Sequence, residues 1–136
     1  MWEVKRIGHV VVWCKDLDKS MAFYKALGCE IDEGTLDRHL HGTLPFVKVI
    51  AGPGSRIDLR PNADWQPVDR EKGNTQHVNL AINGVEDIQV VVNALAERGL
   101  KPDFGPEIQG GKWGFDIYDP DNNRIEIRLF VPAENS

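Results

Sequence analysis

The sequence predicts an α+β fold built from two tandem βαβββ modules, and two observations support this. His9 and His77 each open an apolar, strand-like run and lie 68 residues apart. The segments Arg56–Arg60 and Arg124–Arg128 have the same spacing, and 68 is half of the 136-residue chain. Because strand-like and helical segments follow in the same order in both halves, one unit is expected to be repeated head to tail.

The first module, about residues 1–65, is expected to open with a β-branched strand at residues 6–13. Apolar residues at helical spacing follow between an acidic start at Asp16 and a stop at Gly28, and they predict a helix. Three strands bounded by turn formers are then expected, at residues 29–35, 46–50 and 56–60.

The second module, about residues 72–136, repeats this order after a polar connector at residues 61–74. We expect a strand at residues 75–82 and then a helix that has Glu86 and Asp87 in its first turn, where the helix dipole favours acids. The remaining strands are expected at residues 103–109, 113–118 and 124–131.

Composition excludes several classes of function. The chain is 41% hydrophobic and 27% charged, with a net charge of −5 and no basic run, so a nucleic-acid partner is not expected. No apolar run approaches the roughly 18 residues of a membrane span, and we expect a cytoplasmic protein with no membrane partner. Cys14 and Cys29 are too few for a disulfide framework or a thiolate zinc site, and are expected to be reduced and structural.

The repeat also brings four chemically distinctive side chains into equivalent positions. Two copies related by a pseudo-twofold axis would make His9, Asp58, His77 and Glu126 converge. Two imidazoles and two carboxylates suit a divalent ion: Mn, Fe, Co, Ni or Zn. Taken singly, such a histidine is more often a core residue, and an acid between arginines is more often part of an exposed strand face. Their recurrence together favours the metal.

Several motifs carry a resemblance to a known family: Gly8-His9-Val10, Asp16 to Tyr24 leading into Leu27-Gly28, Gln76-His77-Val78, and Tyr118 to Glu126. With them the sequence resembles the vicinal oxygen chelate superfamily, which includes glyoxalase I, extradiol dioxygenases and bleomycin-resistance proteins. The resemblance implies two βαβββ modules whose eight strands form an open barrel-like sheet around a divalent cation. It also implies a homodimer and a small-molecule substrate.

The resemblance further implies roles for individual residues. His9, His77 and Glu126 fall at ligand positions of the family, and Asp58 falls where glyoxalase I has a fourth ligand, a glutamate. An aspartate is one methylene shorter and stops about 1.5 Å short on the same backbone, so Asp58 is expected to bind directly or through a water. Glu126 would be ligand and general base in turn, with Asp58 as its weaker catalytic counterpart.

Substrate-binding candidates come from three sources. Arginine forks suit carboxylate or phosphate groups, so four arginines are expected to bind an anionic substrate, the alternative being ion pairs with neighbouring acids: Arg56, Arg60, Arg124 and Arg128. By resemblance, Asn62 falls where glyoxalase I binds glutathione, whereas Trp13 replaces an arginine that many glyoxalases use for a glutathione carboxylate. Trp13 and Trp113 are candidates for an aromatic wall, the alternative being core or interface residues.

Three functions remain open at this point. The first is a metal-dependent lyase or isomerase of the glyoxalase I type, the second a single-domain Fe(II) extradiol-type dioxygenase, and the third a metal-free ligand-binding protein of the bleomycin-resistance type. His39 and His41 lie in the least repeat-like segment. A solvated loop is expected there, the alternative being a role in metal binding or proton transfer.

Overall fold

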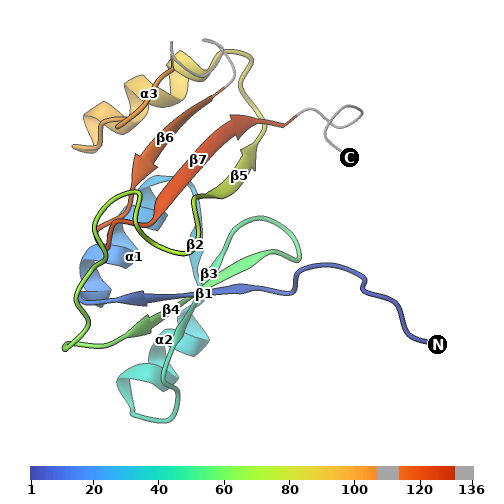
Figure 1. The fold of residues 1–136 in the computed structure, drawn as a ribbon, viewed down its shortest axis with the longest axis vertical. Coiled ribbons are helices and arrows are strands. Elements are labelled where there is room, and N and C mark those ends of the chain that lie inside the picture. The colour runs from blue at the N-terminus through green and yellow to red at the C-terminus, as the bar shows by residue number, and fades with distance from the viewer. Residues whose placement is uncertain (107–113, 131–136) are drawn as a thin grey trace. The chain divides into compact units, whose positions relative to one another are not determined.

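The computed structural model describes residues 1–106 and 114–130 of the chain (Figure 1). Contacts divide the chain into two compact units, unit 1 (Met1–Pro67) and unit 2 (Val68–Ser136). Each unit has its own sheet and at least one helix, and its helices lie between strands along the chain. The expected α+β class is confirmed.

Unit 1 contains these elements: β1 (Val10–Cys14), α1 (Leu17–Ala26), β2 (Glu30–Ile31), α2 (Glu33–Leu40), β3 (Val47–Ile50) and β4 (Arg56–Pro61). Its sheet has the order β1-β4-β3-β2, with β1 and β4 parallel. Helix α1 starts where the Asp16 side chain accepts a hydrogen bond from the Lys19 backbone N–H at 3.1 Å. It contacts β2 and β4 and buries Tyr24 completely.

Unit 2 contains these elements: β5 (Val78–Ile82), α3 (Ile88–Glu97), β6 (Gly114–Tyr118) and β7 (Arg124–Leu129). Its sheet has the order β5-β7-β6, with β5 and β7 parallel. The side chain of Asp87 caps α3 by accepting from the Gln89 backbone N–H at 2.9 Å. Alternate residues of the central strand, Ile125 and Ile127, are buried, so the residue between them lies on the opposite face.

The strand registers of the two units repeat at the spacing seen in the sequence. The pair Val10–Ile57 of β1 and β4 recurs 68 residues later as Val78–Ile125 of β5 and β7, and every other partner pair of these strands follows. The antiparallel pair Lys48–Asp58 likewise recurs as Asp116–Glu126. The two halves of the chain therefore share one local architecture, residue for residue, around their central strands.

A polar turn fixes the register of β6 against β7. Asp119 Oδ1 accepts hydrogen bonds from the backbone N–H groups of Asp121 and Asn123, both at 2.9 Å. Its Oδ2 accepts from the Asn123 side-chain amide, also at 2.9 Å. Aspartate commonly closes a turn in this way. The turn places Asp116 directly opposite Glu126.

One expectation about the strands is corrected, and another is tested only over residues 103–106. The described strands form two separate sheets, of four and three strands, and not one eight-stranded barrel-like sheet. The strand expected at residues 103–109 is represented in the described residues by an isolated bridge between Phe104 and Asp116, and residues 107–113 lie outside the described part.

The strand expected at residues 29–35 is also wrong over most of its length. Only Glu30 and Ile31 are in a strand, and α2 follows. The reason is a strong helix start, because Asp32 accepts a hydrogen bond from the Thr35 backbone N–H at 3.0 Å. The buried Thr35 hydroxyl donates to the Asp32 carbonyl and accepts from the Lys48 backbone N–H at 3.0 Å. These bonds connect α2 to β3.

Both cysteines are buried and neither is in a disulfide, and burial raises the pKa of Cys29 to about 11. Cys29 is therefore a protonated, unreactive group near neutral pH. Among the described helices, none has the length and apolar character that crossing a bilayer requires.

The cap of α2 gives a first testable prediction. Asp32→Ala removes the hydrogen bond to the Thr35 N–H, and we expect it to lower the free energy of unfolding by about 1 kcal/mol. Urea denaturation monitored by circular dichroism measures this. Asp37→Ala, at an exposed position of the same helix, is the matched control and should cost less than about 0.5 kcal/mol. Equal losses in both variants would contradict the role of Asp32 as a cap.

Candidate functional site

Unit 1 brings one predicted histidine and one predicted acid together. His9 immediately precedes β1, and Asp58 lies on the parallel neighbour β4, where Val11 is its register partner. His9 Nε2 is 3.7 Å from Asp58 Oδ2. The Asp58 side chain is 3% exposed and that of His9 is 42% exposed, so the acid is buried beside a ring that reaches solvent.

The Arg56 side chain contacts both members of this pair. Its Nε lies 3.0 Å from Asp58 Oδ1, an ion pair without hydrogen-bond geometry, and its Nη2 donates to Asp58 Oδ2 at 3.2 Å. The same Nη2 is 3.3 Å from His9 Nδ1. Because a guanidinium can only donate, His9 Nδ1 must accept, and the neutral ring then carries its proton on Nε2. Nε2 therefore faces Asp58 as a donor.

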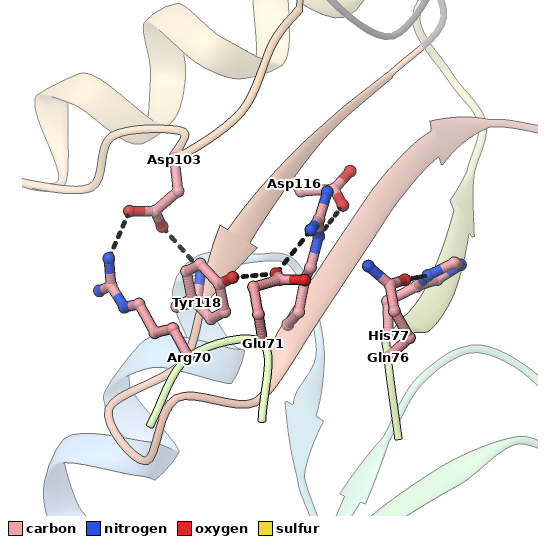
Figure 2. Close-up of polar contacts among 8 residues, drawn as sticks. Arg70, Glu71, Gln76, His77, Asp103, Asp116 and Tyr118 are labelled. Atoms are coloured by element: carbon pink, nitrogen blue, oxygen red, sulfur yellow. Dashed lines mark hydrogen bonds and ion pairs between the residues drawn. The ribbon is translucent and has the colours of Figure 1, made fainter. Parts of the chain in front are cut away.

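Unit 2 builds the equivalent pair differently. His77 Nε2 is 3.9 Å from Glu126 Oε1, and the Glu126 side chain is 14% exposed. Asn79 donates an amide hydrogen bond to Glu126 Oε1 at 2.9 Å. His77 Nδ1 is hydrogen-bonded to the Gln76 side-chain oxygen, as Figure 2 shows. An amide oxygen can only accept, so Nδ1 carries the ring proton and Nε2 keeps a lone pair.

Arg124, the counterpart of Arg56, is held elsewhere. Its Nε donates to Asp116 Oδ2, and its Nη1 donates to Glu71 Oε1 at 2.7 Å (Figure 2). The Tyr118 hydroxyl donates to the same Glu71 oxygen. The Arg124 side chain is 13% exposed, and its guanidinium carbon lies 4.1 Å from the centre of the Phe104 ring. The arginine is thus fixed by two carboxylates and an aromatic face.

The network changes the acidity of its members. The hydrogen bond from Tyr118, followed by that from Arg124, holds the pKa of Glu71 below its ordinary value. Burial, and then the Glu71 hydrogen bond, raises the pKa of Tyr118. Burial opposes the charge of Arg124, but its bonds to Asp116 and Glu71 raise its pKa overall. At neutral pH the network therefore contains an ionised arginine and an ionised Glu71.

The donor spacing can be compared with what a divalent ion requires. Two donors that each lie about 2.1 Å from one ion are at most about 4.2 Å apart. Both histidine–carboxylate pairs meet this limit. The unit 2 pair fits as it stands, whereas in unit 1 Arg56 already neutralises Asp58. Within the described residues, no group of three or more histidine, cysteine, aspartate or glutamate side chains is close enough to hold an ion. The structure therefore shows two donor pairs.

An open cavity of about 270 Å³ adjoins the acid of unit 2. It is lined by Asn79, Ala81, Glu126, Arg128, Leu129 and Phe130. The lining thus includes a carboxylate, a neutral amide and an arginine together with apolar side chains. A small anionic molecule could meet Arg128 and Glu126 within it.

Comparison with known proteins identifies the family. The family model described as "Glyoxalase/Bleomycin resistance protein/Dioxygenase superfamily" matches residues 6–127. The chain belongs to this superfamily. It is 26% identical over 138 residues to the glyoxalase domain-containing protein RDO1 of Mycosarcoma maydis, covering 96% of this chain and 72% of that protein.

Two solved structures of similar fold are informative. A glyoxalase/dioxygenase from Nostoc punctiforme is 25% identical with a TM-score of 0.71, covering 93% of this chain and 92% of that one. The fosfomycin resistance protein FosX of Listeria monocytogenes is 18% identical with a TM-score of 0.64, covering 96% of both chains. That structure is a complex of a FosX mutant with Mn(II) and 1S,2S-dihydroxypropylphosphonic acid.

The remaining substrate-binding candidates from the sequence lie mostly in unit 1. The Arg60 guanidinium carbon lies 5.6 Å from the centre of a Trp13 ring, and Trp13 contacts Trp65 at a centroid distance of 6.3 Å. Asn62 accepts a hydrogen bond from the Asp64 backbone N–H at 3.0 Å and so closes the turn after β4. Trp113 lies outside the described residues.

His39 and His41 are not in a solvated loop, contrary to expectation. His39 is in α2 and His41 is its C-cap. His39 Nδ1 lies 2.8 Å from the Leu44 carbonyl, and His41 Nδ1 lies 2.8 Å from the Asp37 carbonyl. Because carbonyls only accept, both rings donate through Nδ1 and stabilise the end of the helix.

Three residues of the site were missed in the sequence. Asn79 carried a usable signal, because it lies two positions after His77 and so shares its strand face. Asp116 could have been found from its cross-strand position opposite Glu126. Glu71 gave no signal, because it lies in the connector, where the spacing of charged residues does not indicate which strand residues they will contact.

The acidity of Glu71 gives a second testable prediction. Because the pKa of Glu71 is lower in the folded protein, its contribution to stability is complete above the unfolded value of 4.5 and is lost as the pH falls through the folded value. Glu71→Gln should therefore destabilise the protein at neutral pH and much less at about pH 3. Urea denaturation of both proteins at the two pH values measures this. A difference that grows on acidification would contradict the sign.

Proposed function

We propose that the protein is a divalent-metal-dependent enzyme, a glyoxalase I-like lyase or isomerase acting on a small anionic substrate with two neighbouring oxygens. The observation that carries the proposal is the His77–Glu126 pair, which has a histidine lone pair and a carboxylate within chelating distance. Among the described residues, no arginine or lysine is paired with Glu126, whose hydrogen bond comes from the neutral Asn79 amide. This leaves its full negative charge available.

In this proposal His77 and Glu126 of unit 2 hold the ion. The ligand roles that the resemblance implies for His9 and Asp58 stay predictions. When bound, the ion supplies Lewis-acid stabilisation of negative charge on neighbouring substrate oxygens. Glu126 takes a proton from a substrate carbon at one carboxylate oxygen and returns it to the adjacent carbon. The Asn79 hydrogen bond at Oε1 orients that carboxylate. Asp58 is the weaker counterpart of Glu126.

The proposed negative charge of the substrate is inferred from two arginines. Arg128 lines the cavity beside Glu126, and Arg60 lies against Trp13 in unit 1. We propose both as contacts for a carboxylate, phosphate or phosphonate group, since a guanidinium binds such groups through two parallel hydrogen bonds. The FosX complex supports this chemistry, because it contains Mn(II) together with a ligand that carries two neighbouring hydroxyl groups and a phosphonate.

Metal binding is the third testable prediction. We expect untreated protein to contain a divalent ion and the apoprotein to bind Mn²⁺, Co²⁺, Ni²⁺ or Zn²⁺ in calorimetry. His77→Ala should weaken this binding at least about tenfold, because it removes a direct donor. The control is His41→Ala, which removes an exposed histidine at the end of α2 and should leave the affinity unchanged. Equal affinities in both variants, or no ion bound by the wild type, would refute the metal site.

Catalysis by Glu126 is the fourth testable prediction. Glu126→Gln keeps the shape of the side chain and removes its basicity, so turnover of a hemithioacetal or related α-hydroxycarbonyl should fall by about 10²-fold or more. Steady-state kinetics measure the loss, and circular dichroism checks that folding is retained. Wild-type turnover in a folded variant would overturn the assignment.

One observation favours a second function. In unit 1 the Arg56 guanidinium already supplies the positive charge between His9 and Asp58, as it would in a metal-free ligand-binding protein of the bleomycin-resistance type. The metal analysis separates the two, because a binding protein would hold its ligand without any ion. Iron in the untreated protein together with oxygen uptake on adding a catechol would instead identify the extradiol-type dioxygenase.

The homodimer is also part of the proposal. Light scattering coupled to size-exclusion chromatography measures the mass in solution, for which twice the 15.3 kDa of one chain is expected.

A further inference from the structure

The two units place different residues beside otherwise equivalent acids. Asp58 and Glu126 occupy the same register position of their central strands, and each is preceded two residues earlier by an arginine, Arg56 or Arg124. Across the sheet, however, the register partner of Asp58 is Lys48, whereas that of Glu126 is Asp116. The repeat thus exchanges a base for an acid at a single cross-strand position.

The two arginines take different partners. Arg56 lies against the acid of its own strand, 3.0 Å from Asp58, and also reaches His9. Arg124 donates to Asp116 and Glu71. Glu126 receives the Asn79 amide in place of a guanidinium. Whether the arginine pairs with the acid two residues later on its own strand therefore determines whether that acid keeps a net negative charge.

The groups around each arginine explain why Arg56 and Arg124 have different partners. Asp116 is 1% exposed, and a carboxylate at such depth requires a cationic partner because desolvation of an unpaired charge costs several kcal/mol. Glu71 adds a second acceptor and is itself held by the Tyr118 hydroxyl. Lys48 offers no acceptor and repels a guanidinium, so the arginine of unit 1 pairs with the acid that remains, Asp58.

We infer that Asp116 and Glu71 are positioning residues that hold Arg124 away from Glu126 and so keep the Glu126 carboxylate free to bind a cation. The inference deepens the proposed function, on which it rests for the identity of that cation as a divalent metal ion. It predicts that neutralising the two acids converts the half-site of unit 2 into the state seen in unit 1, with the arginine on the acid.

The fifth prediction tests this with a mutant cycle in the full-length protein, using Mn²⁺ as the probe in calorimetry. The variant Glu71→Gln/Asp116→Asn should bind Mn²⁺ at least about tenfold more weakly than the wild type, because Arg124 then competes for Glu126. Adding Arg124→Gln to that variant should restore the affinity to within about threefold of wild type. Arg124→Gln alone should change it much less than it does in the Glu71→Gln/Asp116→Asn background.

Non-additivity is the decisive outcome, because loss of net charge alone would make the effects of the acids and the arginine additive. Asp103→Asn is the matched control. It removes one negative charge from the same unit, at a residue whose partners are Arg70 and the Tyr118 backbone N–H, and it should leave Mn²⁺ affinity unchanged. Additive effects, or an equal loss in the control, would overturn the inference. Asp116→Asn alone serves if the double variant does not fold.

A metal-free measurement separates this inference from the proposed function. In a crystal structure of Glu71→Gln/Asp116→Asn, the Arg124 guanidinium should lie within hydrogen-bond distance of Glu126, as Arg56 lies on Asp58. An arginine that stays on residues 71 and 116 would overturn the inference even if Mn²⁺ binds. Failure of the wild type to bind any ion, with the arginine moved as expected, would instead remove the proposed function and leave the positioning role.

Discussion

The site depends on one constraint, the parallel pairing of an outer strand with the central strand of each sheet. The parallel register of β1 and β4 brings the histidine just before β1 to within 3.7 Å of an acid in β4. The same arrangement brings His77 to Glu126 in unit 2. Parallel neighbours need a crossover connection, and the helix and following strands of each module supply it.

Within that shared frame, the cost of burying charge produces the difference between the units. A carboxylate removed from water keeps a cation or hydrogen-bond donors beside it. For Asp58 the partner is the guanidinium of its own strand, and for Glu126 it is a neutral amide. The first arrangement cancels the charge and the second preserves it. A duplicated fold can therefore specialise its halves by changing a few polar residues.

The sequence predicted much of this arrangement, and its failures have physical causes. The recurrence of His9, Asp58, His77 and Glu126 at one spacing predicted that these four side chains converge. Within each unit the structure brings the histidine and the acid together. The sequence could not show that Arg56 and Arg124 would have different ion-pair partners, since the partner of a long side chain depends on which charged groups surround it in the fold.

The strand expected at residues 29–35 was wrong for a different reason. Expecting the second module to mirror the first favoured a strand, but local capping by Asp32 and Thr35 outweighs that analogy and starts a helix. Thr35 has a wider effect, because its hydroxyl also bonds the backbone of Lys48, the register partner of Asp58. The Asp32 backbone N–H also donates to the Lys48 carbonyl at 2.9 Å. The start of α2 is therefore bonded to both backbone groups of Lys48, which ties this helix to the strand that borders the acid.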